Sequence, residues 1–377
     1  MVVAVLLATG LVAAGLFGAG ALVVERAPAV SSLADATPGR WSTVTLDAPA
    51  ENGDGSPFSI YVKPGSSNNL MVFFGDGGLN WNGETSIQPV TLASSIFGGG
   101  NFYAPNVPFY EVNTFEGILR ADARNPFADY TTVYVPTTTG DLGIGDTTRT
   151  LTSESGEKST ALFNGFNNTR AALDWVYGTV AAPGKVLVAG SGSGGLTAAI
   201  WLGDIGDHYA SVPLYEYSDS AYFAASAFPS VVDSVWRADV EARYGFAVTR
   251  NPLKDAVTYN TARYGSRLTT LVSQTLLDKT LASFSAGLDG GYYSPQAGSD
   301  WNYGLKSTLR ALASPSVGTS VFLTDVDADG RGETPHILAT KDRYVAAAQN
   351  GVSLETWLSN AVNHDNPQSV GFEFLTQ

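Results

Sequence analysis

The stretch KVLVAGSGSGGLTAAI, residues 185–200, restricts the fold of this chain more than any other part of the sequence. The β-branched and apolar run Val186–Val188 predicts a buried strand. Glycines at 190, 192, 194 and 195 follow at once and predict a sharp turn, after which small and apolar residues predict the start of a helix. Because strand, turn and helix in direct succession form the unit of a parallel sheet with packed helices, we expect an α/β fold.

The rest of the chain alternates in the same way. Strands are predicted over residues 58–62, 70–74, 132–135, 186–189, 212–217 and 320–323, and helices over 167–177, 195–202, 231–244, 261–281, 303–312 and 353–362. This order predicts an α/β-hydrolase-like, mostly parallel sheet with helices on both faces. We expect one domain over 41–377, preceded by a short polar linker over 30–40.

The charge balance excludes several classes of partner. Of the 377 residues, 35 are Asp or Glu and 21 are Lys or Arg, which gives a net charge of −14. An acidic chain without a basic run is not expected to bind nucleic acid or an anionic membrane surface. The chain has no cysteine, so disulfides, thiolate catalysis and cysteine-ligated zinc are excluded as well.

The N-terminus predicts export. Residues 2–24 carry no charge and are rich in Val, Leu, Ala and Gly. Export allows two interpretations of residues 1–29: a cleaved signal peptide, with Ala27-Pro28-Ala29 resembling its cleavage site, or an uncleaved membrane anchor, since the stretch is long enough to span a bilayer. Either one places the domain outside the cell or in the cell envelope. A buried core helix is the third interpretation of this stretch.

The glycine turn is also where an α/β hydrolase carries its nucleophile, in the pattern G-x-S-x-G. Gly190 and Gly194 fit the two glycines of that pattern, which places Gly192 at the nucleophile position. Serines flank it at 191 and 193. Ser193 becomes the nucleophile only if the turn slips by one residue, and the surrounding glycines would let the backbone absorb such a slip.

The remaining members of a catalytic triad have few candidates, because the chain contains three histidines. His336 follows the predicted strand at 320–323, which is the place of the base in this fold, where the chain order is Ser, Asp, His. His208 and His364 lie elsewhere. The acid is expected between nucleophile and base, and both Asp278 and Asp219 satisfy that order.

A second glycine-rich segment, MVFFGDGGLNWNG at 71–83, runs directly out of a predicted strand. Glycines let backbone N–H groups approach a substrate oxygen closely. We therefore expect Gly77 and Gly78, together with the N–H of Gly194 after the nucleophile, to form the oxyanion hole. A plain turn is the simpler interpretation of this segment taken alone.

The loop before His336, TDVDADGRGETPH, has the spacing of a cation-binding loop. Asp325, Asp327 and Asp329 alternate, Gly330 follows them, and Glu333 lies at the ninth position. Carboxylates with this spacing can wrap a hard cation. The twelfth position is histidine, so this is not an EF-hand. A structural Ca²⁺ is one interpretation and a solvated acidic turn is the other. No cofactor is expected for catalysis.

Several motifs in order resemble the pectinacetylesterase family, and its bacterial members in particular. They are FFGDGG (73–78), NPFADYTTVYVPTTTGDLGIGD (125–146), SDSAYF (218–223), SQTLLD (273–278) and HILATKDRYVAAAQNGVSLETWL (336–358). The resemblance implies an α/β-hydrolase fold, His336 as the base, Asp278 rather than Asp219 as the acid, and hydrolysis of O-acyl esters, chiefly acetyl groups on polysaccharides. The chain departs from the family where its serine nucleophile would stand.

Two functions follow from that departure. In the first, Ser193 attacks the acyl carbon, His336 takes its proton and Asp278 orients the histidine, so that the chain cleaves an acylated polysaccharide or a small ester. In the second, Gly192 stands at the nucleophile position and the chain is an inactive relative that binds glycan or protein. Loss of a nucleophile leaves the other binding groups in place, so both functions are compatible with the same pocket.

Overall fold

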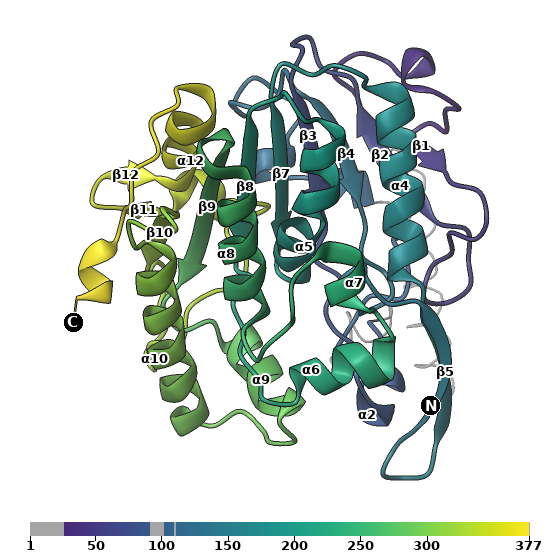
Figure 1. Ribbon diagram of the computed structural model, residues 1–377, viewed down its shortest axis with the longest axis vertical. Coiled ribbons are helices and arrows are strands. Elements are labelled where there is room, and N and C mark those ends of the chain that lie inside the picture. Colours follow the sequence, from purple (N-terminus) through teal and green to yellow (C-terminus); the bar gives the residue numbers. More distant parts are fainter. Residues whose placement is uncertain (1–25, 91–101, 109–110, 377) are drawn as a thin grey trace, which may run out of the picture.

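The computed structural model describes residues 26–90, 102–108 and 111–376. Its centre is an eight-stranded sheet in the order β1-β2-β4-β3-β7-β8-β9-β10 (Figure 1). The strands are β1 (Ser42–Thr45), β2 (Ser59–Lys63), β3 (Leu70–Phe74), β4 (Thr131–Val135), β7 (Val186–Ser191), β8 (Leu214–Asp219), β9 (Leu268–Thr275) and β10 (Ser320–Thr324). Strand β2 runs antiparallel to β1 and β4, and every other pair is parallel. The predicted α/β-hydrolase-like sheet is confirmed.

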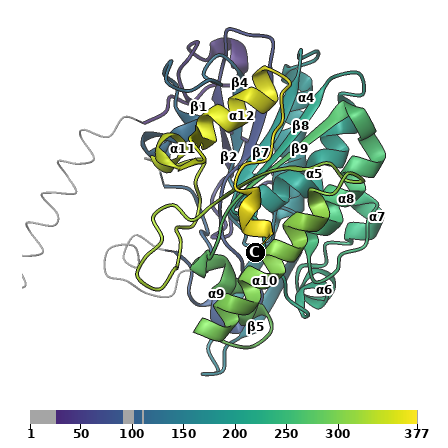
Figure 2. The same ribbon diagram turned by 90° about the vertical axis from the view of Figure 1, so that its left-hand side faces the viewer.

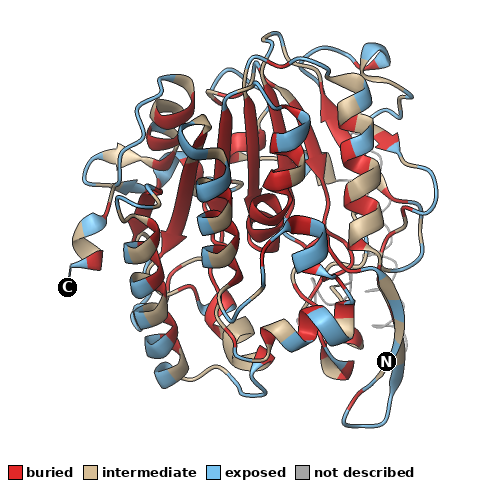
Figure 3. Cartoon of the chain, in the orientation of Figure 1, coloured by how far each residue is buried: buried red, intermediate tan, exposed pale blue. Residues whose placement is uncertain are grey.

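Helices cover both faces of this sheet, as Figures 1 and 2 show. Side chains that alternate along β3 separate the two cores, because neighbouring strand residues point to opposite faces. Val72 and Phe74 pack with the helices α4 (Gly165–Thr179), α5 (Ser193–His208), α8 (Pro252–Tyr264) and α10 (Pro295–Leu312). Phe73 packs in a second core with α11 (Arg343–Ala346) and α12 (Leu354–Asn363). The central strands are buried along their whole length (Figure 3).

The predicted helix over 261–281 is wrong. This segment contains the end of α8, strand β9 and the start of α9 (Lys279–Leu288). Strand β9 is covered on both faces, so its residues show no polar alternation, and periodicity alone does not separate such a strand from a buried helix. The Thr-rich and β-branched sequence LTTLVSQT was the signal for a strand.

The predicted helix over 231–244 is broken. A π-helical turn, η4 (Val231–Trp236), and the short helix α7 (Val240–Tyr244) divide it. Between them Arg237 and Asp239 have left-handed backbones, at φ +52° and +46°. The sequence prediction also lacked β1 and the hairpin β5 (Thr147–Thr152) and β6 (Lys158–Phe163). The remaining elements are α2 (Gly83–Ser86), α6 (Phe228–Ser230), β11 (Ala348–Gln349), β12 (Val352–Ser353), η1 (Leu33–Asp35), η2 (Glu111–Thr114), η3 (Gly117–Leu119), η5 (Gly265–Arg267) and η6 (Phe372–Leu375).

The predicted export segment, residues 2–24, lies outside the described residues. Pro28 and Val30, at the predicted cleavage site and just after it, pair with the edge strand β1: the Val30 N–H donates to Thr43 O and the Thr43 N–H donates to Pro28 O. The expected linker over 30–40 lies against the domain, where Leu33 packs on the core and Ala36 is buried. Within the part of the chain that the structure describes, no helix is both long and apolar enough to cross a membrane.

Candidate active site

The glycine turn is a tight connection between β7 and α5, with Gly192 at its apex. Gly192 has φ +57° and ψ −128°, in the region that favours glycine, and Ser193 is already the first residue of α5. A Cβ at Gly190 would lie 2.2 Å from Gly194 O, and one at Gly194 would lie 2.2 Å from Phe74 O. These contacts allow only glycine at both positions. The turn therefore does not slip by one residue, and Gly192 stands in the place of the nucleophile.

The space in front of this apex is filled by a carboxyl group from another loop. A Cβ at Gly192 would lie 2.4 Å from Asp76 Oδ1 and 2.5 Å from Asp76 Cγ. Asp76 follows β3 and reaches the region into which a side chain at position 192 would project. Asp76 is not among the site residues predicted from the sequence. Its signal was a carboxylate inside the glycine run at 75–78.

Each oxygen of Asp76 has its own set of partners. Oδ1 accepts hydrogen bonds from the Ser193 N–H and the Ser193 hydroxyl, both at 3.0 Å, and from the Gly78 N–H at 3.3 Å. Oδ2 lies 3.4 Å from His336 Nε2. Burial raises the pKa of Asp76, but hydrogen bonds and the His336 charge outweigh it and hold the pKa below its usual range. The carboxylate is therefore ionised at neutral pH.

His336 is held by the acid that the sequence analysis favoured. Its Nδ1 lies 2.6 Å from Asp278 Oδ2, so the expected contact is present. The Asp278 side chain is fully buried, and its Oδ1 caps helix α9 by accepting from the Leu281 N–H at 3.1 Å. Burial lowers the pKa of His336, but the two carboxylates, Asp278 and Asp76, raise it well above its ordinary value. This arrangement favours the protonated form of His336.

Asp219, the other candidate acid, has a different task. Its Oδ1 accepts from the Ser273 hydroxyl at 2.7 Å, and its Oδ2 accepts from the N–H groups of Leu338 and Ala339, each at 2.9 Å. These bonds fasten the segment that follows His336 to the end of β8. Asp219 thus positions the histidine loop and does not bond to the imidazole.

Ser193, the predicted nucleophile, contacts Asp76 and not His336. Its Oγ accepts from the Gly77 N–H at 2.9 Å and lies 3.0 Å from Asp76 Oδ1. Because the turn does not slip, the side chain of Ser193 starts from the first turn of α5, and Asp76 lies between it and the histidine. For the same reason the N–H after the apex belongs to Ser193 and not to Gly194. Of the two predicted oxyanion glycines, Gly77 thus faces Ser193 and Gly78 faces Asp76.

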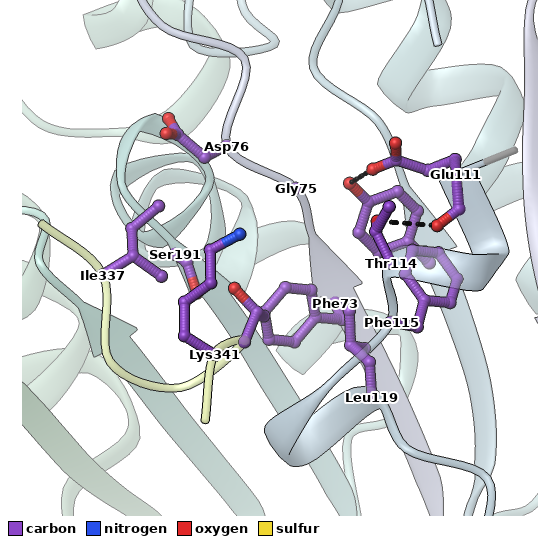
Figure 4. A pocket seen from close by; sticks show the side chains of 12 residues that line it. Phe73, Gly75, Asp76, Glu111, Thr114, Phe115, Leu119, Ser191, Ile337 and Lys341 are labelled. Atoms are coloured by element: carbon purple, nitrogen blue, oxygen red, sulfur yellow. Dashed lines mark hydrogen bonds between the residues drawn. The ribbon is translucent and has the colours of Figure 1, made fainter. Parts of the chain in front are cut away.

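A cavity of about 170 Å³ opens beside Asp76 (Figure 4). Phe73, Phe115 and Leu119 contribute apolar walls, and Ser191 and Lys341 contribute polar groups. The Ser191 hydroxyl is buried and has no hydrogen-bond partner among the described residues. The cavity therefore has hydrogen-bonding capacity that the protein itself leaves unused.

The predicted calcium ligands are turned toward separate partners. Asp327 Oδ2 pairs with Arg343 Nε at 2.8 Å, and Glu333 pairs with Lys279 at 3.0 Å and with the Tyr293 hydroxyl at 2.9 Å. The remaining members include Asp329, whose Oδ1 accepts from the N–H groups of Arg331 and Glu333. Within residues 26–90, 102–108 and 111–376, no group of three or more His, Cys, Asp or Glu side chains is placed to hold a metal ion. The four carboxylates are therefore not gathered around one point in this structure, and calcium stays a prediction.

Thermal unfolding tests the calcium prediction. A ligand that binds only the folded chain stabilises it, so millimolar Ca²⁺ is expected to raise the Tm above the value in chelator. The Asp325→Asn/Asp329→Asn variant should lose that rise, because it removes two of the proposed ligands and leaves the ion pairs of Asp327 and Glu333 in place. Equal Tm values for the wild type in Ca²⁺ and in chelator would favour the solvated turn.

A comparison of the chain with protein-family models gave no match, and neither did a comparison with curated proteins. The resemblance to pectinacetylesterases rests on the sequence motifs given above.

Proposed function

We propose that this chain is a hydrolase whose proton-transfer pair is His336 and Asp278. The observation that carries the proposal is the row Asp278–His336–Asp76 at the apex of the β7–α5 turn, with 2.6 Å on one side of the imidazole and 3.4 Å on the other. A buried acid fixes the orientation of the ring, and Nε2, on the Asp76 side of the imidazole, faces the point where an α/β hydrolase attacks its substrate.

The groups around Asp278, His336 and Asp76 are of the types that form and stabilise a covalent intermediate. Asp76 and Ser193 are both nucleophile types, and each lies beside the turn. Backbone N–H groups of Gly77, Gly78 and Ser193 converge on the same region and can hold a developing negative charge. His336 moves protons between the attacking group, water and the product.

Hydrolysis of O-acyl esters by Ser193 is one form of this function. It is supported by the Gly77 N–H on Ser193 Oγ at 2.9 Å and by the resemblance to pectinacetylesterases. In that form the serine proton would pass to Asp76 at 3.0 Å, since the serine has no hydrogen bond to the histidine. An acetylated polysaccharide outside the cell would be the substrate, as expected from the predicted export segment.

The proposal is tested by measuring the rate of hydrolysis of two classes of small substrate, acyl esters and alkyl halides. We expect His336→Gln and Asp278→Asn to reduce turnover by roughly 10⁴-fold or more, the scale of loss when a member of a catalytic triad is replaced. His364→Gln is the matched control, because His364 is exposed at the end of α12 and is expected to leave the activity unchanged.

Equal, background-level rates for the wild type and both variants would contradict the proposal. The chain would then belong with the inactive relatives that bind glycan or protein. Melting curves of all variants show whether each one is folded, so that loss of structure is not counted as loss of activity.

A further inference from the structure

We propose that Asp76 is the nucleophile of this site and that its substrate is a small alkyl halide, whose halide Asp76 displaces from a saturated carbon. The inference rests on the proposed hydrolase function and deepens it, because it names an alkyl halide, and not an acyl ester, as the substrate. It starts from the position of the Asp76 carboxyl, in the place of a side chain at Gly192 and in contact with His336.

The two oxygens of Asp76 are already divided between the two tasks of such a nucleophile. Oδ1 is held by three donors, two of them backbone N–H groups. Oδ2 faces His336 Nε2, and the Asp76 side chain retains 29% of its surface exposed. Oδ2 is therefore the oxygen that can reach a substrate carbon, and Oδ1 is the oxygen that carries negative charge when water later attacks Cγ.

In the first step Oδ2 forms a bond to the substrate carbon, the carbon–halogen bond breaks, and the halide leaves with the electron pair. No proton moves in this step. The reaction needs an ionised carboxylate, and the lowered pKa of Asp76 supplies one at neutral pH. The product is an alkyl ester of Asp76.

In the second step a water molecule attacks Cγ of the ester, and His336 Nε2 accepts a proton from it. The negative charge of the intermediate rests on Oδ1, opposite the N–H groups of Ser193 and Gly78. The bond from Cγ to the alkylated oxygen then breaks, and the leaving alkoxide takes the proton from His336 Nε2 as it departs as an alcohol. The new carboxyl group loses its remaining proton to solvent. Asp76 is an ionised carboxylate again, and one of its oxygens now comes from water. Overall, halide and water become alcohol, halide ion and one proton released to solvent.

The charge state of His336 changes in the direction that the second step needs. Two carboxylates raise the pKa of His336 before the reaction. Esterification removes the charge of Asp76, so one of these two causes disappears and the pKa of His336 falls. The imidazole can then lose its proton and act as a base.

The cavity beside Asp76 is small and of mixed polarity, with the Glu111 carboxyl and the Lys341 ammonium among its lining groups, and it has room for a short alkyl chain and its anionic leaving group. Its volume is about 170 Å³, and the walls from Phe73, Phe115 and Leu119 are apolar. The unpartnered Ser191 hydroxyl and the Lys341 ammonium, both at this cavity in Figure 4, offer donors to a departing halide.

The test uses 1-bromobutane as the substrate and wild-type protein in water enriched in heavy oxygen. A single turnover is expected to place the heavy oxygen on Asp76, found by mass spectrometry of the peptide that contains it. Heavy oxygen in the butanol alone would mean direct attack by water and would overturn the inference. This measurement needs no variant, so it does not depend on how a variant folds.

Two variants extend the test. His336→Gln is expected to release one equivalent of bromide and then stop, with a butyl group retained on Asp76. Asp76→Asn is expected to release no bromide, while Asp174→Asn, an exposed carboxylate on α4, should behave as wild type. A butyl group on Ser193 would overturn the inference. Ester hydrolysis that depends on His336, without bromide release, would overturn it and keep the proposed function. Absence of both reactions in the wild type would overturn both.

Discussion

Asp76→Gly and Gly192→Ser, introduced together, are expected to turn this site into an acyl esterase. The serine at the apex would take the space that the Asp76 carboxyl leaves, since a Cβ at 192 meets Asp76 atoms at 2.4–2.9 Å. His336 would keep its buried acid Asp278 and would face the new hydroxyl. With one carboxylate removed, the pKa of His336 falls and the imidazole can accept the serine proton.

The single variants are the matched controls for this exchange. Gly192→Ser alone places its side chain against the Asp76 carboxyl, and Asp76→Gly alone leaves the apex without a nucleophile. We expect both to hydrolyse p-nitrophenyl acetate at background rates, and the double variant to exceed them by about 10²-fold or more, the scale of one preorganised catalytic contribution. Bromide release from 1-bromobutane should disappear in the double variant.

A folded double variant without esterase activity would contradict this expectation. It would mean that the backbone of the turn, at φ +57°, does not present a serine in a productive orientation. A fluorophosphonate that labels residue 192 distinguishes a reactive serine from an unreactive one. The exchange thus tests whether Asp76 alone separates this site from a serine hydrolase.

The sequence was sufficient for the sheet because its strands are short apolar runs bounded by turn residues. Leu70–Phe74 was predicted to the residue, and five of the other strands were placed within a few residues of their ends. Strand β9 was missed because a strand buried on both faces has no alternation to distinguish it from a buried helix. The left-handed residues Arg237 and Asp239, which break the helix predicted over 231–244, carry no glycine or proline signal.

The candidate site likewise contains one contact that the sequence could predict and others that it could not. The contact of His336 with Asp278 could be predicted because the chain order Ser, Asp, His allowed Asp278 and the resemblance to pectinacetylesterases favoured it over Asp219. The role of Asp76 could not, since the contact between Asp76 and Ser193 joins residues 117 positions apart. Only the three-dimensional structure shows that the Asp76 carboxyl group fills the space that a side chain at Gly192 would occupy. The spacing of the carboxylates predicted a calcium loop. It did not show that Asp327 pairs with Arg343 and that Glu333 pairs with Lys279.

The second large effect is expected at Glu216, a carboxyl group buried in β8 below the start of α5. Ser218 Oγ lies 2.5 Å from Glu216 Oε1 and 2.8 Å from Gly195 O, while Glu216 Oε2 has no partner among the described residues. The Ser218 hydroxyl has one proton. When it donates that proton to Gly195 O, the short contact with Glu216 is a hydrogen bond only if the carboxyl group is protonated and donates to Ser218 Oγ. Burial accordingly raises the pKa of Glu216 to about 8.

This raised pKa predicts a pH-dependent gain in stability for Glu216→Gln. Between the pKa of the unfolded chain, about 4.3, and the folded value, the folded state binds a proton that the unfolded state releases, so the free energy of unfolding falls as the pH rises. Glutamine keeps the shape and the donor toward Ser218 but does not titrate. Urea unfolding should therefore show little difference at pH 4 and a gain of a few kcal/mol, growing up to pH 8, for the variant. Glu241→Gln, at an exposed glutamate on α7, should show no such trend, and a pH-independent difference at position 216 would mean that Glu216 is already ionised in the folded protein.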